Sequence, residues 1–506
     1  MGNRTRIVCT LGPAVDSESM LKNLLAAGMD VARIDCSHGT PAERAARIER
    51  VQKVARELDN PCAVMVDVRG PKIRTGRLLN GVPVLLRAGD HLTLTEDDVE
   101  GTARRVSITC RGLADYVEPG TIVLLDDGNI ELAVDHAGGS EILCTVQQTG
   151  MLGENCSVAL PGTSFPLPIL TPRDTEDLLA GIKLGVDFVA VSKVSDGDDV
   201  RKVRLFLEQN QGSGIKVIAK IETADAVENI EDIVDAADGV MIVRGSLSLH
   251  VPGFDVPYIQ KQIVRACARD YKPVIVGTQL LDSMRRAPKP TRAEVADVAA
   301  AVYDGADALV LSRETATGTY PATAVQAVAG IAEAAESHLY TAGAPIERDQ
   351  DFGMLAPAVG VAAVRTAESV GALAVVTPTS SGRTARLVST LRPKMPIYAI
   401  CGSKAVARSL QISWGVTPLI GKIGGEMDET VESARTAVLS RGLMNEGDLA
   451  VFTAGDRKTC PRRRSADGTP QKTGHVSTNV MYVAEILGED AERENDPETA
   501  ADAEEA

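Results

Sequence analysis

Two neighbouring stretches, Lys216–Glu222 (KVIAKIE) and Gly239–Ser248 (GVMIVRGSLS), indicate the fold. Each begins as a short apolar run, as a buried strand would, and ends in polar residues, with a helical pattern between them. Such a β/α unit is the repeat of barrels whose strand carboxyl ends carry the chemistry. Lys220 and Glu222 are two residues apart, so on a strand their side chains point to the same side. Together they could hold an anionic phosphate and a divalent cation.

The same unit recurs along the chain. Eight mostly apolar runs, separated by helical patterns, are candidates for parallel strands that are covered on both faces. They are Arg6–Gly12, Asp30–Ser37, Pro61–Val68, Asp187–Val194, Lys216–Glu222, Gly239–Arg244, Pro273–Gln279 and Ala308–Ser312. Eight β/α units predict an α/β fold of the TIM (β/α)8 barrel type.

Two segments depart from this repeat. Between Gly76 and about Pro168, short alternating runs and turn signals predict an inserted all-β domain that hangs over the barrel mouth as a lid. Beyond it and the rest of the barrel, short apolar strands flanked by helical stretches predict a C-terminal α/β domain; the expected strands are Ala372–Thr377, Ile397–Cys401, Thr417–Ile420 and Leu449–Ala454. The expected bounds are 1–76 and 169–345 for the barrel, 77–168 for the lid, 346–487 for the C-terminal domain, and 488–506 for an acidic disordered tail.

The composition of the 506 residues is that of a soluble globular protein. A net charge of -16 argues against nucleic acid or an anionic membrane as a partner. No apolar run reaches the length of a transmembrane helix and no signal peptide is recognisable, so we expect a cytoplasmic protein. The nine cysteines are scattered, which favours reduced core thiols. The basic segment Asp456–Lys472 is expected to be an exposed loop.

Several further motifs occur in a fixed order. They are Arg6–Ala14 (RIVCTLGPA), Gly28–Gly39 (GMDVARIDCSHG), Gly70–Gly76 (GPKIRTG), Thr278–Met284 (TQLLDSM), Pro290–Glu294 (PTRAE) and Ser312–Ala316 (SRETA). With the domain order, they make the chain resemble the pyruvate kinase family from Thr5 to about Leu487. The resemblance implies transfer of a phosphoryl group from phosphoenolpyruvate to ADP in glycolysis, by a homo-oligomer that we expect to be a tetramer.

The resemblance also implies roles for individual residues. Lys220 matches the lysine that stabilises the moving phosphoryl group, and Arg33 an arginine that grips phosphate. Glu222 matches a carboxylate ligand of Mg²⁺ or Mn²⁺. Thr278 matches the residue near the carbon that receives a proton. The other expected substrate contacts are Gly245, Ser246, Arg74 and Ser192, and the expected nucleotide contacts are His38 and Arg74.

The chain departs from the family at the expected metal site. Ser246 replaces the second acidic metal ligand, and a hydroxyl supplies no negative charge. Asp282 or Glu314 could have taken over that role. Lys193 stands where the family usually has phenylalanine. Further replacements, in the lid segment and in two barrel motifs, are Asn155, Cys156, Ala159, Ser248 and Arg313.

Lys72 lies where the family commonly has glutamate and requires K⁺, whereas members with lysine dispense with the ion. An ammonium can supply the same fixed positive charge, so we expect no K⁺ requirement. Asp35 could pair with this ammonium, and the competing interpretation is a plain surface salt bridge. The residues of this monovalent-cation region are Asp35, Ser37, Asp67 and Lys72.

A loop in the C-terminal part resembles the family's cradle for phosphorylated effectors. Hydroxyls, a glycine and backbone amides before a helix suit an anion, although family members have this loop with or without an effector. Its residues are Thr379, Ser381, Gly382 and Arg383.

Two alternatives stay open at this stage. Ser246 and the missing lid lysines favour a weakly active or non-catalytic paralogue that binds a metabolite and serves a regulatory role. Another barrel enzyme acting on phosphoenolpyruvate or pyruvate is the second alternative, and the predicted lid and the PTRAE motif argue against it.

Overall fold

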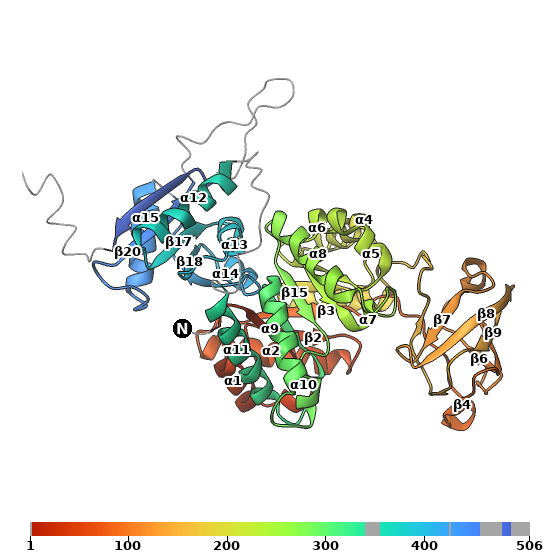
Figure 1. Cartoon of the computed structure of the whole chain (residues 1–506). Coiled ribbons are helices and arrows are strands. Elements are labelled where there is room, and N and C mark those ends of the chain that lie inside the picture. Colours follow the sequence, from red (N-terminus) through yellow and green to blue (C-terminus); the bar gives the residue numbers. More distant parts are fainter. Residues whose placement is uncertain (1–2, 340–354, 425–426, 456–477, 487–506) are drawn as a thin grey trace, which may run out of the picture.

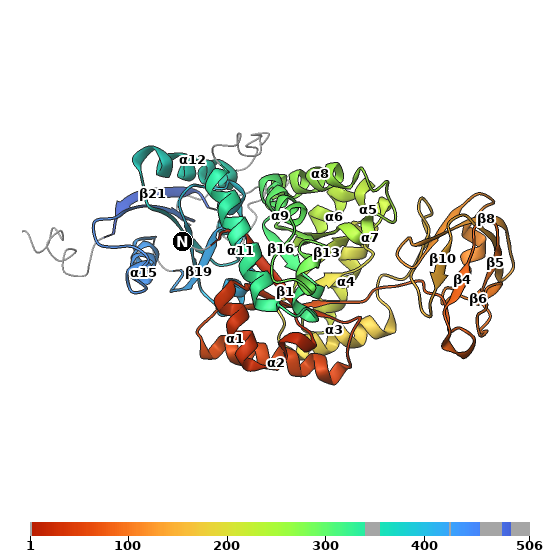
Figure 2. The same cartoon turned by 60° about the horizontal axis from the view of Figure 1, so that its bottom comes forward.

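The computed structural model describes residues 3–339, 355–424, 427–455 and 478–486. An α/β barrel lies in the middle of the molecule, with an all-β domain on one side and a second α/β domain on the other (Figures 1 and 2). The expected acidic tail at 488–506 and the basic segment Asp456–Lys472 lie outside the described residues. The expected end of the barrel part at residue 345 does so too.

The central part is a closed barrel of eight parallel strands, as predicted. Each strand lies within its predicted run, and β16 closes the barrel on β1 through the pair Arg6 and Ala308. The strands are β1 (Arg6–Thr10), β2 (Val31–Asp35), β3 (Ala63–Asp67), β12 (Phe188–Val191), β13 (Lys216–Ile221), β14 (Gly239–Val243), β15 (Val274–Gly277) and β16 (Ala308–Leu311).

Helices surround this barrel. They are α1 (Glu18–Ala27), α2 (Pro41–Glu57), α3 (Pro172–Leu184), α4 (Gly197–Gln209), α5 (Ala224–Glu228), α6 (Ile230–Ala236), α7 (Arg244–Leu247), α8 (Val256–Arg269), α9 (Arg292–Asp304), α10 (Arg313–Ala316) and α11 (Pro321–His338). Three of them begin with a capping box, in which a threonine and an acidic residue satisfy each other's backbone amides. The local sequence therefore fixes where α2, α3 and α9 begin.

The barrel interior is divided into an apolar and a polar part. Inward-facing side chains such as Met65, Phe188 and Ile218 form one buried cluster, which Ile412 of the C-terminal domain joins. Thr10, Asp67 and Lys220 are buried polar residues at or near the carboxyl ends of their strands. The C-terminal domain therefore packs on the amino-terminal side of the barrel and leaves the polar end to the inserted domain.

The inserted domain lies between β3 and α3, and it is all-β as predicted. It has a six-stranded and a two-stranded sheet around its own apolar core. Its turn at Gly128 meets the barrel, because a Cβ atom there would lie 3.2 Å from the Leu249 side chain. The strands are β4 (Val84–Leu86), β5 (His91–Thr95), β6 (Arg105–Ser107), β7 (Ile122–Leu125), β8 (Ile130–Gly138), β9 (Glu141–Val146), β10 (Gly150–Leu152) and β11 (Val158–Ala159).

The C-terminal domain has a five-stranded sheet in the order β19-β18-β17-β20-β21. Four of these strands were predicted, whereas β21 was missed and pairs antiparallel with β20. The strands are β17 (Ala374–Thr379), β18 (Ile397–Cys401), β19 (Val416–Ile420), β20 (Leu449–Ala454) and β21 (Val480–Glu485). The helices are α12 (Leu355–Val370), α13 (Arg383–Thr390), α14 (Lys404–Ser409) and α15 (Met427–Leu439).

Arginines and one tryptophan join this domain to the barrel. Trp414 is buried, and the guanidinium carbons of Arg392 and Arg4 lie 4.8 and 5.2 Å from its ring centroid. Arg392 also pairs with Asp307, just before β16, at 2.9 Å. The contact therefore combines a buried aromatic ring with fixed charges.

Two expectations from composition can be compared with the structure. No helix among the described residues is both long enough and apolar enough to cross a membrane. The eight cysteines in the described part of the chain are buried and free.

Candidate active site at the carboxyl ends of the barrel strands

Neighbouring barrel strands bring the predicted polar residues together. The strands β2, β3, β12 and β13 are adjacent in this order around the barrel. They position five buried residues at or near their carboxyl ends, which are Arg33, Asp67, Ser192, Lys220 and Glu222. Residues far apart in the sequence therefore form one buried polar cluster.

Arg33 is fixed by three partners. Its Nε donates to Asp67 Oδ2 at 2.7 Å, its Nη1 donates to Thr10 Oγ1 at 2.8 Å, and its Nη2 lies 3.3 Å from Asp35 Oδ2. Burial opposes the charge of the guanidinium, but Asp67 and Asp35 outweigh burial and raise the pKa of Arg33. Arg33 is therefore a permanently charged, rigid donor, which suits an anion.

Lys220 lies in the middle of the cluster. Its Nζ donates to Ser192 Oγ at 2.7 Å and to Asp67 Oδ1 at 3.0 Å, and it lies 3.3 Å from Glu222 Oε1. Burial acts against its charge, yet Asp67 and Glu222 prevail and raise the pKa of Lys220. The ammonium therefore stays charged although the residue is buried.

Ser192 is held where it can receive this ammonium. Its hydroxyl donates to the carbonyl of Val68 at 2.9 Å. Gly70 packs directly against it with φ 67°, and a Cβ atom at that position would lie 2.7 Å from Ser192 Cβ. Only glycine accepts both this backbone conformation and this close approach.

Glu222 is surrounded by positive charge. Burial alone would raise the pKa of its carboxyl, but Lys220, Lys193 and Lys72 lower it. The backbone N–H of Lys193 donates to Glu222 Oε2 at 3.1 Å. Both carboxylate oxygens therefore already face cationic or donor groups of the protein.

Thr278 and Gly245 meet at the ends of β15 and β14. The Gly245 N–H donates to Thr278 Oγ1 at 2.8 Å, and this hydroxyl donates to the Gly277 carbonyl at 2.6 Å. Thr278 has φ 72° and the next residue, Gln279, φ 56°, which is rare for residues with a side chain. Such strain concentrates at functional sites, so it supports a role for Thr278. Ser246 follows Gly245 in α7 and is half-buried.

Asp35 and Lys72, which could have paired, form no direct ion pair, although the charge of Lys72 helps to lower the pKa of Asp35 after that of Arg33. Lys72 Nζ donates to Ser37 Oγ at 3.0 Å, whereas Asp35 pairs with Arg33, two residues away on the same face of β2. Lys72 as a residue is exposed, yet desolvation of its ammonium and the neighbouring Lys220 lower its pKa. The ammonium thus lies close enough to the cluster to act on it through charge.

The two expected nucleotide contacts lie at the rim of the cluster. His38 is exposed and follows β2 by three residues. Arg74, where the chain leaves the barrel for the inserted domain, donates from Nη1 to the carbonyl of Asn155 at 2.6 Å. Arg74 therefore links the barrel to the lid segment.

The residues do not fit a divalent cation held by the protein. The described residues contain no group of three or more acidic, histidine or cysteine residues arranged as metal ligands. Glu314 accepts bonds from the backbone amides of Leu281 and Ser312, and Asp282 lies 3.4 Å from Arg285, so neither replaces the acid lost at Ser246. Glu222 alone, among three ammonium groups, lacks the excess negative charge that such a site needs.

The predicted effector loop lies in the C-terminal domain, away from this cluster. It follows β17, and the Gly382 N–H donates to Thr379 Oγ1 at 2.9 Å with Gly382 at φ 81°. The Ser381 carbonyl accepts from Arg386 at 3.2 Å, and Arg383 begins α13. The loop is compact, but its amide and carbonyl groups are partly used within the loop itself.

Two residues of the site were missed by sequence reasoning. Thr10 is the last residue of β1 and accepts a hydrogen bond from Arg33. A polar residue at the carboxyl end of a predicted barrel strand could have indicated this role from the sequence. His250 contacts Lys193, with Nε2 and Nζ 3.0 Å apart, but it lies beyond α7, where no strand pattern indicates it.

The chain has a closed barrel with a fixed lysine and a fixed arginine at the carboxyl ends of its strands, and a β domain is inserted beside this end. These features define a class of barrel protein that is suited to binding phosphorylated anions. Family models agree with this class: "Pyruvate kinase, barrel domain" matches residues 2–325, and "Pyruvate kinase, alpha/beta domain" matches residues 357–465. The chain belongs to the pyruvate kinase family.

Similar proteins support this membership. A pyruvate kinase from Sporosarcina psychrophila is 41% identical over 456 residues, covering 89% of this chain and 78% of that protein. One from Staphylococcus aureus (strain MRSA252) is 41% identical over 491 residues, covering 96% and 81%. A crystal structure of a pyruvate kinase from Cryptosporidium parvum has a TM-score of 0.85 and 31% identity, and 96% of each chain is covered.

Proposed function

We propose that this protein transfers a phosphoryl group from phosphoenolpyruvate to ADP. The phosphorus–oxygen bond to the enol oxygen breaks, a bond to the terminal phosphate oxygen of ADP forms, and the enolate takes up a proton to give pyruvate. The observation that carries the proposal is the buried Lys220 ammonium, held by Ser192 and Asp67 in a protein of this family.

The cluster suits this reaction because phosphoryl transfer depends on positioning and charge stabilisation. Lys220 and Arg33 are fixed cations within one polar cluster, each bonded to Asp67. Neither has to reorganise when charge develops on the moving group, and in many enzymes such preorganised charge contributes most of the rate enhancement. Thr278, held by Gly245, would position the water that protonates the enolate carbon.

In this proposal the expected Mg²⁺ or Mn²⁺ binds together with the nucleotide, not to a site formed by the protein alone. Nucleotide phosphates themselves supply oxygen ligands to such ions, which then need few protein carboxylates. This agrees with the surroundings of Glu222, whose neighbouring ammonium groups disfavour a cation bound directly to its carboxylate.

A coupled assay of pyruvate formation from phosphoenolpyruvate and ADP tests the proposed function directly. We expect saturable, enzyme-dependent pyruvate production. The crowding of Glu222 by ammonium groups favours a weakly active paralogue as the second candidate. Binding of phosphoenolpyruvate without turnover would support that candidate and contradict the kinase assignment.

The position of Lys72 predicts activity without K⁺. Its ammonium is bonded to Ser37 and supplies a fixed positive charge near Lys220 and Asp35. Turnover in a buffer of tetramethylammonium salts should therefore equal turnover after K⁺ is added back. Lys72→Glu should create a K⁺ requirement, which serves as the matched comparison. A strict requirement in the wild type would show that Lys72 does not replace the ion.

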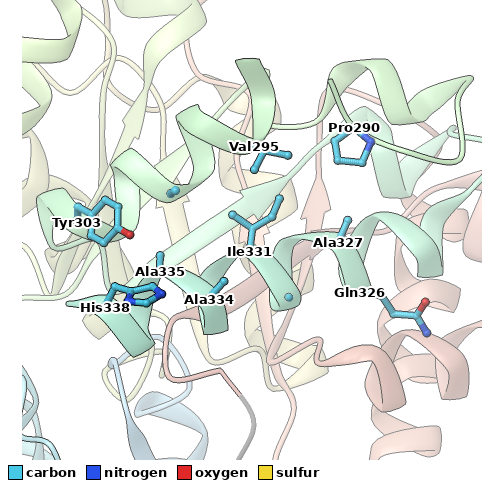
Figure 3. Close-up of a pocket in the computed structure, with 11 residues that line it drawn as sticks. Pro290, Val295, Tyr303, Gln326, Ala327, Ile331, Ala334, Ala335 and His338 are labelled. Carbon is cyan, nitrogen blue, oxygen red and sulfur yellow. The ribbon is translucent and has the colours of Figure 1, made fainter. Parts of the chain in front are cut away.

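The barrel part has a surface hollow between α9 and α11 (Figure 3). We propose that this hollow forms a subunit contact in a homo-oligomer, which we expect to be a tetramer. The hollow measures about 440 Å³, and its lining includes Val295 and Tyr303, which expose 38% and 44% of their surface. Exposed apolar patches of this kind mark protein contacts. Ala334, exposed within the hollow, lies near Ile331 on α11.

Ala334→Glu should reduce the oligomeric state, because it places a charge in an apolar contact. Sedimentation velocity of both proteins measures the change. Ser337→Glu, exposed on the same helix outside the hollow, is the control and should leave the mass unchanged. An unaltered mass for Ala334→Glu would remove this surface from the assembly.

A further inference from the structure

Lys193 has an unusual position in the site. It follows Ser192 at the end of β12 and adopts φ 60°, a left-handed conformation that is rare for residues with a side chain. Its backbone N–H donates to Glu222 Oε2 at 3.1 Å, and its ammonium is close enough to help lower the pKa of Glu222. The left-handed backbone therefore turns the amide of Lys193 to this carboxylate, and the ammonium acts on the same carboxylate through its charge.

His250 holds the Lys193 side chain in this place. The Nζ of Lys193 lies 3.0 Å from His250 Nε2. Burial, and then the charge of Lys193, lower the pKa of His250 to about 4, while Glu222 acts in the other direction. His250 is thus neutral at physiological pH, and its Nε2 can accept a hydrogen bond from the ammonium.

The positive and negative charges of the cluster do not balance. With every group in its charged form, four cationic side chains face three carboxylates, which is an excess of one positive charge; they are Arg33, Lys72, Lys193 and Lys220, with Asp35, Asp67 and Glu222. Burial lowers the pKa of Lys193 and of Lys72, whereas the Glu222 carboxylate acts in the other direction and favours their charged forms. A divalent cation would raise this excess to three and would be repelled by the ammonium groups around Glu222. A phosphorylated carboxylic acid would be attracted.

We propose that the Lys193 ammonium supplies, beside Glu222, the positive charge that a divalent cation would otherwise supply there. The site then binds phosphoenolpyruvate without a metal ion held by the protein. Ser246 and Lys193 act together in this arrangement. A serine at 246 removes the carboxylate that would attract a metal, and the lysine at 193 restores a single positive charge for the substrate anion. The inference deepens the proposed function and rests on it.

Isothermal titration of the full chain with phosphoenolpyruvate, once with EDTA and once with Mn²⁺, tests the inference without turnover. We expect the same affinity in both titrations. Lys193→Met, which keeps most of the side-chain length but no charge, should weaken binding in EDTA by about tenfold or more, as is usual when a charged hydrogen-bonding group is lost. Lys261→Met is the control, since Lys261 lies on α8 with a side chain that is 56% exposed.

Mn²⁺ binding, followed through the electron paramagnetic resonance signal of the free ion, gives a second readout. Ser246→Asp should bind Mn²⁺ about tenfold or more tightly than the wild type. Lys193→Met/Ser246→Asp should bind Mn²⁺ more tightly still, and it should bind phosphoenolpyruvate only when Mn²⁺ is present. Thermal melts followed by circular dichroism identify any variant that has not folded.

The outcomes separate the inference from the function on which it rests. Binding of phosphoenolpyruvate to the wild type only with Mn²⁺ overturns the role of Lys193 and leaves the kinase assignment intact. Unchanged affinity of folded Lys193→Met in EDTA overturns it as well. Absence of binding in both titrations contradicts the proposed function together with the inference.

Discussion

Lys220→Met should lower kcat by about three orders of magnitude or more, because a charge at the transferring phosphoryl group acts mainly in the transition state. The Lys220 ammonium is bonded to Ser192 and Asp67, and it lies in the same cluster as Arg33. Methionine has a similar length and no charge, so the packing should change little. Steady-state kinetics with phosphoenolpyruvate and ADP measure the effect, and kcat and KM should be determined separately.

Lys216 provides a matched control on the same strand. It begins β13, at the opposite end from Lys220, and lies 3.5 Å from Asp238. Lys216→Met therefore removes a lysine from the same element without touching the cluster, and its kcat should equal that of the wild type. If Lys220→Met also keeps the wild-type kcat, Lys220 has no role in the mechanism and the assignment of the cluster as the active site is wrong.

The sequence predicts the barrel well for a physical reason. Parallel strands that are covered on both faces are continuous apolar runs, and this pattern is visible without knowledge of their partners. The same pattern places Arg33, Lys220 and Glu222 at strand ends. β21 was missed in the C-terminal domain although Val480–Ala484 (VMYVA) is a continuous apolar run that could have indicated it. In the structure it is an edge strand, and residues such as Tyr482 are exposed.

The partners within the site could not be predicted in the same way. Lys220 and Asp67 are 153 residues apart and meet only because the strands are adjacent in the closed barrel. Asp35 could have formed a direct ion pair with Lys72, but its ion-pair partner is Arg33 on the same face of β2. Lys193 was recognised only as a replacement, since its approach to Glu222 depends on a left-handed turn that no sequence pattern specifies.

Trp414→Ala should destabilise the protein by about 3–5 kcal/mol, the usual cost of removing a buried large aromatic side chain. Trp414 exposes only 2% of its surface, and the guanidinium groups of Arg4 and Arg392 both lie over its ring at the contact of the C-terminal domain with the barrel. Its removal leaves a cavity and takes the aromatic face from both cations, each contact contributing about 0.5–2 kcal/mol. The loss should therefore weaken the docking of the two domains.

Urea unfolding followed by far-ultraviolet circular dichroism measures this change. Fluorescence is unsuitable, because Trp414 is the only tryptophan in the chain. Phe254→Ala is the control: Phe254 is fully exposed, at 101%, so its removal should alter the free energy of unfolding by no more than about 0.5 kcal/mol. Equal unfolding midpoints for the two variants would mean that the Trp414 ring does not hold the domains together. A lower midpoint for Trp414→Ala alone would locate the stabilising contact at the amino-terminal side of the barrel, the side opposite the strand ends that carry the active site.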